Sequence, residues 1–177
     1  MGWITSLAKH RASGGGLLLL VLLAILLVVP LWRHRDIDHP LASRQALDVC
    51  PLLPAWPASF GIAGSRAGMS RCELVDASGN LVLGIGLSSQ RAMAAGSSRG
   101  GTRLMYDTWL KEVRASGAVD VRDEPGPWRA ASSYTLGSHR DLLIEDGGLL
   151  IVLSSPRLAP EAMRSYAEAL APALRAR

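Results

Sequence analysis

Residues 142–154, Leu-Leu-Ile-Glu-Asp-Gly-Gly-Leu-Leu-Ile-Val-Leu-Ser, decide the fold of this 177-residue chain. An Asp-Gly-Gly step between two apolar runs predicts a β-hairpin, because glycine readily adopts the positive φ angles of tight turns. We therefore expect paired strands over Leu142–Glu145 and Leu149–Ser154. Residues 149–153 are apolar at every position, which predicts a strand that is covered on both faces.

A second hairpin is expected upstream, with strands over Ser70–Asp76 and Leu81–Ser88. One face of its second strand carries leucine and isoleucine, and the other carries Gly84 and Gly86. Because glycine has no side chain, we expect another element or another protein to approach the backbone there, and these glycines mark a candidate docking face. Further short strands are expected over Val119–Arg122 and Trp128–Leu136.

Apolar residues recur with helical spacing from Thr102 to Ser116 and again after Pro160, where Pro172 should kink the helix or end it early. This order of elements predicts an α+β fold, a small domain with a largely antiparallel sheet covered by helices. The assignment is completed by a short helix over Ser43–Cys50 and by loops over Pro51–Gly68 and Gln90–Gly101.

The stretch Leu17–Trp32 contains no polar side chain. As a helix it would be about 24 Å long, close to the thickness of a bilayer core. Trp32, Arg33 and Arg35 suit the headgroup region, and no small-residue cleavage site follows, which argues against a removed signal peptide. The fold class therefore includes one N-terminal transmembrane helix, an uncleaved single-pass anchor. The expected parts are a cytoplasmic tail over 1–13, the anchor over 14–33, a tether over 34–42 and an extracytoplasmic domain over 43–177.

The net charge of +4 is confined to the N-terminal end. Lys9, Arg11, Arg33 and Arg35 precede the first acid, Asp36, so fifteen acids face fifteen of the nineteen basic residues from there onward. The remainder of the chain has no overall basic field. We therefore expect no nucleic-acid partner.

Both cysteines, Cys50 and Cys72, follow the apolar stretch. Two cysteines in a small domain fit one disulfide in an oxidising compartment, and that bond would close a loop of about twenty residues. This interpretation places the domain on the periplasmic side of a bacterial inner membrane. The alternatives are two free buried thiols in a cytosolic domain and, less favoured, a zinc site.

The motif Asp48-x-Cys50-x-Leu52-Leu53, a second cysteine that starts a strand, a central helix, a late hairpin and a closing amphipathic helix are similar to a known family. They resemble the small extracytoplasmic domains of actinobacterial lipoproteins and receptor-kinase sensors with a PsbP-like α/β sandwich fold. The resemblance implies a disulfide and a non-catalytic binding or structural role. The chain departs from that family by lacking a lipid-acceptor cysteine and by carrying Glu73 after Cys72.

The strongest catalytic pattern is Gly96-Ser97-Ser98-Arg99-Gly100, which is followed by Asp120 and His139 in the order used by α/β-hydrolases. No apolar strand precedes Ser98, so we interpret this segment as a loop and expect no catalytic residue, metal or cofactor. Arg99 and Arg103 are candidate anion contacts at a helix N-terminus. Asp123-Glu124 and Glu145-Asp146 are adjacent carboxylates at turns, to which the pattern assigns no catalytic role.

These observations predict a single-pass inner-membrane protein with a non-catalytic periplasmic domain. It would act by protein contacts, as an accessory or assembly subunit of a cell-envelope complex. The alternatives are a ligand- or lipid-binding, sensor-like module with a pocket between sheet and helices, and a membrane-anchored immunity protein. The expected partners are the lipid bilayer, through the N-terminal helix, and an envelope protein.

Overall fold

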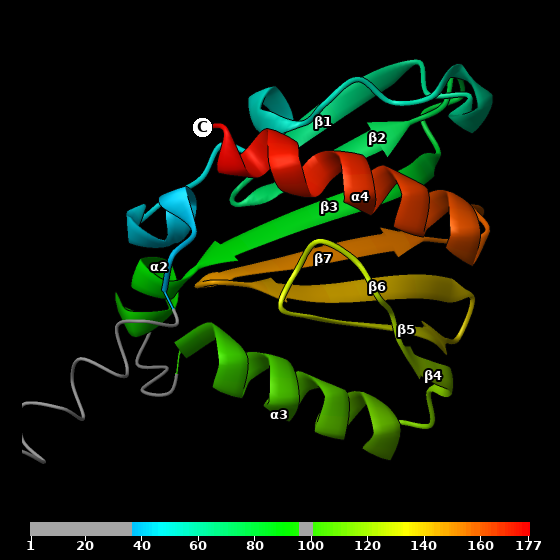
Figure 1. The fold of residues 1–177 in the computed structure, drawn as a ribbon. Helices are drawn as coiled ribbons and strands as arrows, with labels where there is room; N and C mark the ends of the chain where they lie inside the picture. The colour runs from blue at the N-terminus through cyan, green and yellow to red at the C-terminus, as the bar shows by residue number, and fades with distance from the viewer. Residues whose placement is uncertain (1–36, 96–100) are drawn as a thin grey trace, which may run out of the picture. The chain divides into compact units, whose positions relative to one another are not determined.

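Seven antiparallel strands form one sheet in the order β1-β2-β3-β7-β6-β5-β4 (Figure 1). The structure is a computed structural model that describes residues 37–95 and 101–177. The strands are β1 (Gly64–Gly68), β2 (Arg71–Val75), β3 (Leu81–Ser89), β4 (Val119–Asp123), β5 (Ala130–Leu136), β6 (His139–Asp146) and β7 (Leu149–Ser155). The helices are α2 (Gln90–Ala95), α3 (Gly101–Ala115) and α4 (Pro160–Arg175), with short 3-10 helices η1 (Pro40–Ser43), η2 (Cys50–Leu52) and η3 (Ala58–Phe60).

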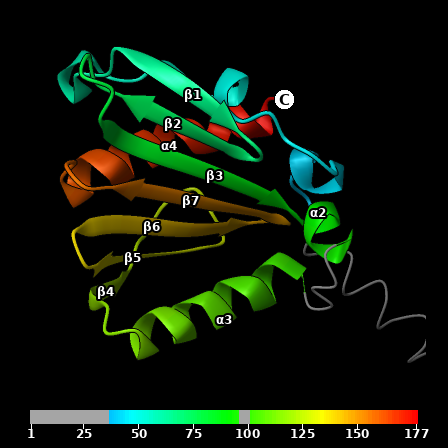
Figure 2. The ribbon, with the colours of Figure 1, turned by 180° about the vertical axis from the view of Figure 1, so that it is seen from behind.

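The sheet lies between two layers, because alternate residues of its central strands are apolar on both sides. Helix α4 and the segment before β1 cover one face, and α3 covers part of the other (Figures 1 and 2). On the α4 face the core includes Leu83, Ile85, Ile151, Leu153 and, from α4, Leu170, all at most 1% exposed. On the α3 face, Tyr106, Leu110 and Val113 pack against Leu143 and Leu150.

The two expected hairpins are confirmed. Strands β2 and β3 pair antiparallel, with Cys72 opposite Ile85. Strands β6 and β7 pair around the Asp146-Gly147-Gly148 turn, with Ile144 opposite Ile151. Strand β7 is covered on both faces, because its side chains belong alternately to the core on the α4 face and to the core on the α3 face. The helix expected from Thr102 to Ser116 is α3.

Four local predictions were wrong. The expected helix over Ser43–Cys50 does not form: after η1 the chain is irregular, and Leu47 and Val49 are buried against the sheet. The expected loop over Pro51–Gly68 ends in strand β1, and the loop over Gln90–Gly101 begins with helix α2. Of the two effects expected of Pro172, a kink or an early end, the early end is wrong, because α4 continues to Arg175.

The fold class expected from the sequence also needs a correction. It combined the α+β domain with a transmembrane helix, but no helix within residues 37–95 and 101–177 is long and apolar enough to cross a membrane. Helices α3 and α4 have 15 and 16 residues and each carries a charged side, whereas a span requires about 20 apolar residues. The span expected over 14–33 lies outside the described residues, as do Leu17, Trp32, Arg33 and Arg35.

The compact unit begins at Ile37, before the expected domain boundary at residue 43. Residues 37–42 were expected to be a tether, yet His39, Leu41 and Ala42 are at most 4% exposed. Backbone N–H groups of Asp38 and His39 both donate to the Gly147 carbonyl, at 3.1 and 2.9 Å. This segment is therefore part of the folded domain.

Candidate functional site

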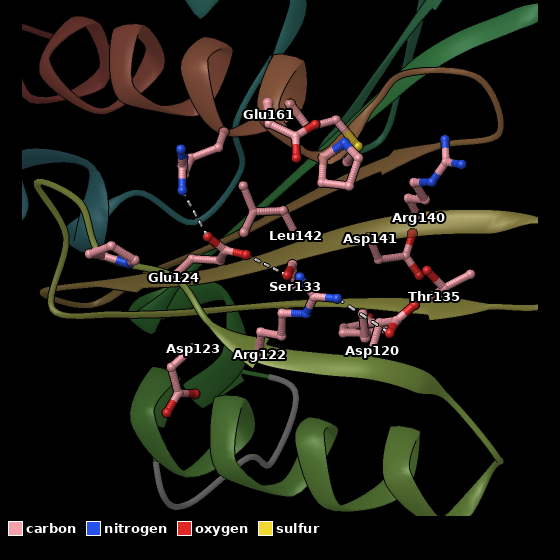
Figure 3. Close-up of a pocket in the computed structure, with 15 residues that line it drawn as sticks. Asp120, Arg122, Asp123, Glu124, Ser133, Thr135, Arg140, Asp141, Leu142 and Glu161 are labelled. Carbon is pink, nitrogen blue, oxygen red and sulfur yellow. Dashed lines mark hydrogen bonds and ion pairs between the residues drawn. The ribbon is translucent and has the colours of Figure 1, made fainter.

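A groove of about 390 Å³ lies on the α4 side of the sheet, beyond the edge of α4 (Figure 3). Its floor comes from β5 and β6, one wall from the first turns of α4, and the other wall from β4 and the loop that follows it. Figure 1 shows this loop arching in front of β6. The residues that line this α4 groove are Asp120, Arg122, Asp123, Glu124, Pro125, Ser133, Tyr134, Thr135, Arg140, Asp141, Leu142, Pro160, Glu161, Met163 and Arg164.

The groove exists because α4 does not extend over the β4 margin of the sheet. The buried residues of α4 pack against the core centred on β3, β7 and β6, and no residue of β4 belongs to that cluster. On the same face, β5 presents Ser133 and Thr135, whose small polar side chains leave space above the sheet. Leu142 and Met163, each 2% exposed, close the inner end with apolar surface.

Glu124 joins the walls of the groove. Its carboxylate accepts a hydrogen bond from Ser133 Oγ at 2.6 Å and lies 3.5 Å from Arg164 Nη1 on α4. Its side chain is 14% exposed. Trp128 Nε1 donates to the Glu124 carbonyl at 3.0 Å, which fixes the loop between β4 and β5. The groove is therefore held open by specific contacts.

Asp120, Glu124 and Glu161 stand against three arginines in the groove lining, since the side chains of Asp123 and Asp141 lie on the α3 face. Arg122 lies 3.4 Å from Asp120, and both side chains are more than 60% exposed, so this pair is screened by solvent. Arg140 donates to the Leu158 carbonyl at 3.0 Å. Charged walls around an apolar end are typical of sites that bind small polar molecules with some apolar surface.

A row of polar side chains crosses the opposite, α3, face of the sheet. Tyr134, Asp141 and Ser154 lie opposite one another on β5, β6 and β7. Burial raises the pKa of Asp141, although hydrogen bonds with Ser154 and Tyr134 act in the other direction, and its Oδ1 has no hydrogen-bond partner within the described residues. Burial also raises the pKa of Tyr134 to about 12, and Trp109 Nε1 donates to its hydroxyl at 3.0 Å.

This row is not arranged as a Ser-His-Asp triad, although His139 Nδ1 lies 3.3 Å from Ser154 Oγ. In a triad the histidine lies between the serine and the carboxylate that orients it. Here Asp141 lies opposite Ser154 in the β6–β7 register, and within the described residues no carboxylate hydrogen bonds to His139. The contacts therefore hold Ser154 without activating it.

We expect Asp141→Asn to stabilise the protein near neutral pH. Because the folded-state pKa of Asp141 is raised, the folded state disfavours the ionised carboxyl, and the amide removes that cost. Each unit of raised pKa corresponds to about 1.4 kcal/mol. Thermal melts at pH 7.5 and at pH 3 check this: the variant should melt higher at pH 7.5, and the gain should vanish at pH 3. A melting temperature that is lower than that of the wild type by the same amount at both pH values would contradict this prediction.

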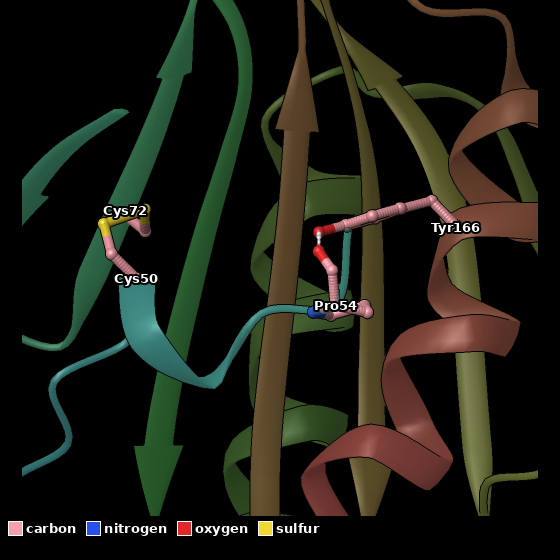
Figure 4. Close-up of a disulfide and its surroundings, with 4 residues drawn as sticks. All are labelled: Cys50, Pro54, Cys72 and Tyr166. Atoms are coloured by element: carbon pink, nitrogen blue, oxygen red, sulfur yellow. Dashed lines mark hydrogen bonds between the residues drawn. A yellow bond between two sulfur atoms is a disulfide. The ribbon is translucent and has the colours of Figure 1, made fainter. Parts of the chain in front are cut away.

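The disulfide keeps the segment before β1 on the α4 face. Cys50 in η2 and Cys72 in β2 are bonded, with their Cα atoms 5.1 Å apart (Figure 4). Four residues further on, the Pro54 carbonyl accepts a hydrogen bond from Tyr166 of α4 at 3.3 Å. The ring of Phe60 lies 5.9 Å from that of Tyr166. This part of the prediction is confirmed: both cysteines form the disulfide.

The other expected site residues are not brought together. Gly84 and Gly86 lie on the α3 face of β3, where Arg71 Nη2 would be 3.4 Å from a Cβ at Gly84 and Val152 would be 3.9 Å from one at Gly86. Arg103 lies on α3, over the Tyr106 ring and 3.3 Å from Asp107. Ser98 and Arg99 lie outside the described residues. The docking and anion roles of these residues stay predictions.

The sequence offered only partial signals for the α4 groove. Asp123-Glu124 was recognised as a carboxylate pair at a turn, but its partner Arg164 is forty residues away on another element. Ser133 and Thr135 on β5 carried a weak signal: small polar residues alternate there with buried ones. No pattern in the sequence connects these three segments.

Comparisons with protein-family models, with curated proteins and with solved structures found no match to this chain. The structure by itself defines a disulfide-bonded α+β domain with one antiparallel sheet between helical layers.

Proposed function

We propose that residues 37–177 form a non-catalytic binding module and that the α4 groove holds its ligand. The observation that carries this proposal is the groove itself, a concavity of about 390 Å³ with an apolar inner end and charged walls from four elements. That volume lies in the range of small-molecule sites in proteins. Its balanced charges favour a small polar or zwitterionic molecule over a purely apolar one.

The Cys50–Cys72 disulfide supports an extracytoplasmic location for this module. Disulfides persist in oxidising compartments and are rare in the cytosol, where thiols are kept reduced. The surroundings of His139 support a non-catalytic role, since a triad needs a carboxylate that orients the histidine and no carboxylate within the described residues hydrogen bonds to His139. A binding module outside the cytoplasm is consistent with both features.

Native mass spectrometry of the full chain, purified from cells under mild conditions, tests this proposal. We expect a fraction of the protein to carry one small molecule, because a groove with fixed walls retains a ligand that fits it. Collisional activation should release that molecule and give its mass. Recovery of the bare chain alone, from cells and after incubation with envelope extract, would contradict the proposal.

A second candidate function is protein contact through the α3 face of β1, β2 and β3, which no helix within the described residues covers (Figure 2). This face includes Gly84 and Gly86 and an ion pair of Arg71 with Glu73 at 3.0 Å. A photo-crosslinker at Gly86, where a Cβ meets only an ordinary contact, would capture one partner protein if this function is correct. The control position is Thr108, which is exposed on α3: a photo-crosslinker there should not capture that partner protein.

A further inference from the structure

The turn between β6 and β7 anchors the segment Asp38–Ser43, which we call the strap. The Gly147 carbonyl accepts hydrogen bonds from the backbone N–H groups of Asp38 and His39. Gly147 and Gly148 have φ angles of 56° and 97°, and a side chain on Gly147 would clash with Asp38. The turn that defines the hairpin is therefore also the docking point of the strap.

Charged groups surround this docking point. Asp146, 1% exposed, accepts two hydrogen bonds from Arg175 of α4, at 2.6 and 3.0 Å. Asp38 lies 3.1 Å from Arg129 and 3.7 Å from Arg175. Glu145 faces the other side of the sheet. The strap is thus packed against an ion-pair network that links β6 to the end of α4.

His39 lies in this network and is 4% exposed. Its Nδ1 accepts a hydrogen bond from the Leu41 N–H at 3.2 Å, so the proton of the neutral ring is on Nε2. Nε2 is buried and has no hydrogen-bond partner within the described residues. Burial lowers the pKa of His39, the charges of Asp146 and Asp38 raise it, and that of Arg175 lowers it.

We propose that His39 makes the strap an acid-labile latch: a proton at Nδ1 displaces the Leu41 N–H, and the strap leaves the β6–β7 turn while the sheet stays folded. Two observations support this step. The Nδ1 atom that would take the proton already accepts the N–H that caps η1, and two N–H groups repel. The resulting cation would also be buried, because His39 is 4% exposed and burial is the largest influence on its pKa.

The pH dependence has a definite sign. The folded state favours neutral His39, so its contribution to strap stability is complete above about pH 6.5 and is lost as the pH falls through the lower folded-state value. The opening is local, because Leu41 is the strap's contribution to the core cluster of the α4 face, whereas the other members of that cluster come from the sheet, α4 and the segment around Val49.

Hydrogen–deuterium exchange of the full chain, measured by mass spectrometry from pH 7.5 to pH 4.5, tests the latch. The measured exchange rates are divided by the intrinsic amide exchange rates at each pH, so that only changes in protection remain. We expect protection of the peptide spanning residues 38–44 to fall by up to about tenfold per pH unit between about pH 6.5, the pKa of an exposed histidine, and the lower folded-state pKa of His39. Peptides from β3 and β7 should keep their protection over the same range.

His39→Asn is the matched control. An asparagine Oδ1 can accept the N–H two residues on, as Nδ1 of His39 does, but it does not titrate. We expect the variant to keep the strap protected at every pH, whereas His39→Ala should lose that protection throughout. Strap protection in the wild type that does not change with pH would overturn the proposal, as would an equal loss in His39→Asn. Should His39→Asn not fold, the wild-type profile alone still decides.

Discussion

Reduction of the Cys50–Cys72 disulfide is expected to lower the free energy of unfolding by about 3 kcal/mol. The two cysteines are 22 residues apart, and opening a loop of that length restores conformational entropy to the unfolded chain. The bond also fixes η2 against β2, so its loss frees the segment that packs on Tyr166. The effect is a substantial part of the stability of a domain this size.

Urea unfolding of the full chain with and without reductant measures this effect. We expect the midpoint to fall by roughly 1–3 M urea when the bond is reduced. The double variant Cys50→Ala/Cys72→Ala should unfold at a similarly low concentration and should not respond to reductant. A wild-type midpoint that is the same in both buffers would show that the bond contributes nothing.

The second large effect is expected from Arg175→Ala, which should cost about 3 kcal/mol, the low end for a broken buried ion pair. Asp146 is 1% exposed, so loss of its two hydrogen bonds from Arg175 leaves a buried charge without its main partner. The Arg175 side chain is 38% exposed, so water can partly replace the guanidinium, which is why we take the low end.

Two further variants separate charge burial from general damage to α4. Arg164→Ala removes an arginine of the same helix whose ion pairs are at 3.5 and 4.0 Å and whose side chain is 43% exposed, so we expect a cost of about 1 kcal/mol or less. Asp146→Asn in the Arg175→Ala background should recover part of the loss, because the amide is neutral. Equal costs for Arg164→Ala and Arg175→Ala, measured by urea unfolding, would contradict the buried pair.

The sequence predicted the elements whose local signals agree with the fold. Asp146-Gly147-Gly148 between two apolar runs is one such signal, and the spacing of Tyr106, Leu110 and Val113 on α3 is another. Strand β1 was missed because Gly-Ser-Arg-Ala-Gly has no apolar alternation and forms only by pairing with β2. The expected Ser43–Cys50 helix does not form, because Leu47 and Val49 pack against the sheet from an irregular segment.

The candidate site could not be predicted because it depends on register and on distant contacts. Glu124 and Arg164 meet only because α4 returns across the sheet, and Tyr134, Asp141 and Ser154 align only because three strands pair in one register. The strap shows the same limit. The sequence predicted that His39 lies in a polar tether. In the structure His39 is buried, because its segment contacts a turn more than a hundred residues away.

A matched pair of variants in native mass spectrometry tests the binding module most directly. Thr135→Trp places a large side chain in the α4 groove, and Thr108→Trp places the same side chain on the exposed side of α3. We predict that wild type and Thr108→Trp carry the same small molecule, whereas Thr135→Trp, folded and disulfide-bonded, is recovered without it. Retention of that molecule by Thr135→Trp would contradict the assignment of the groove.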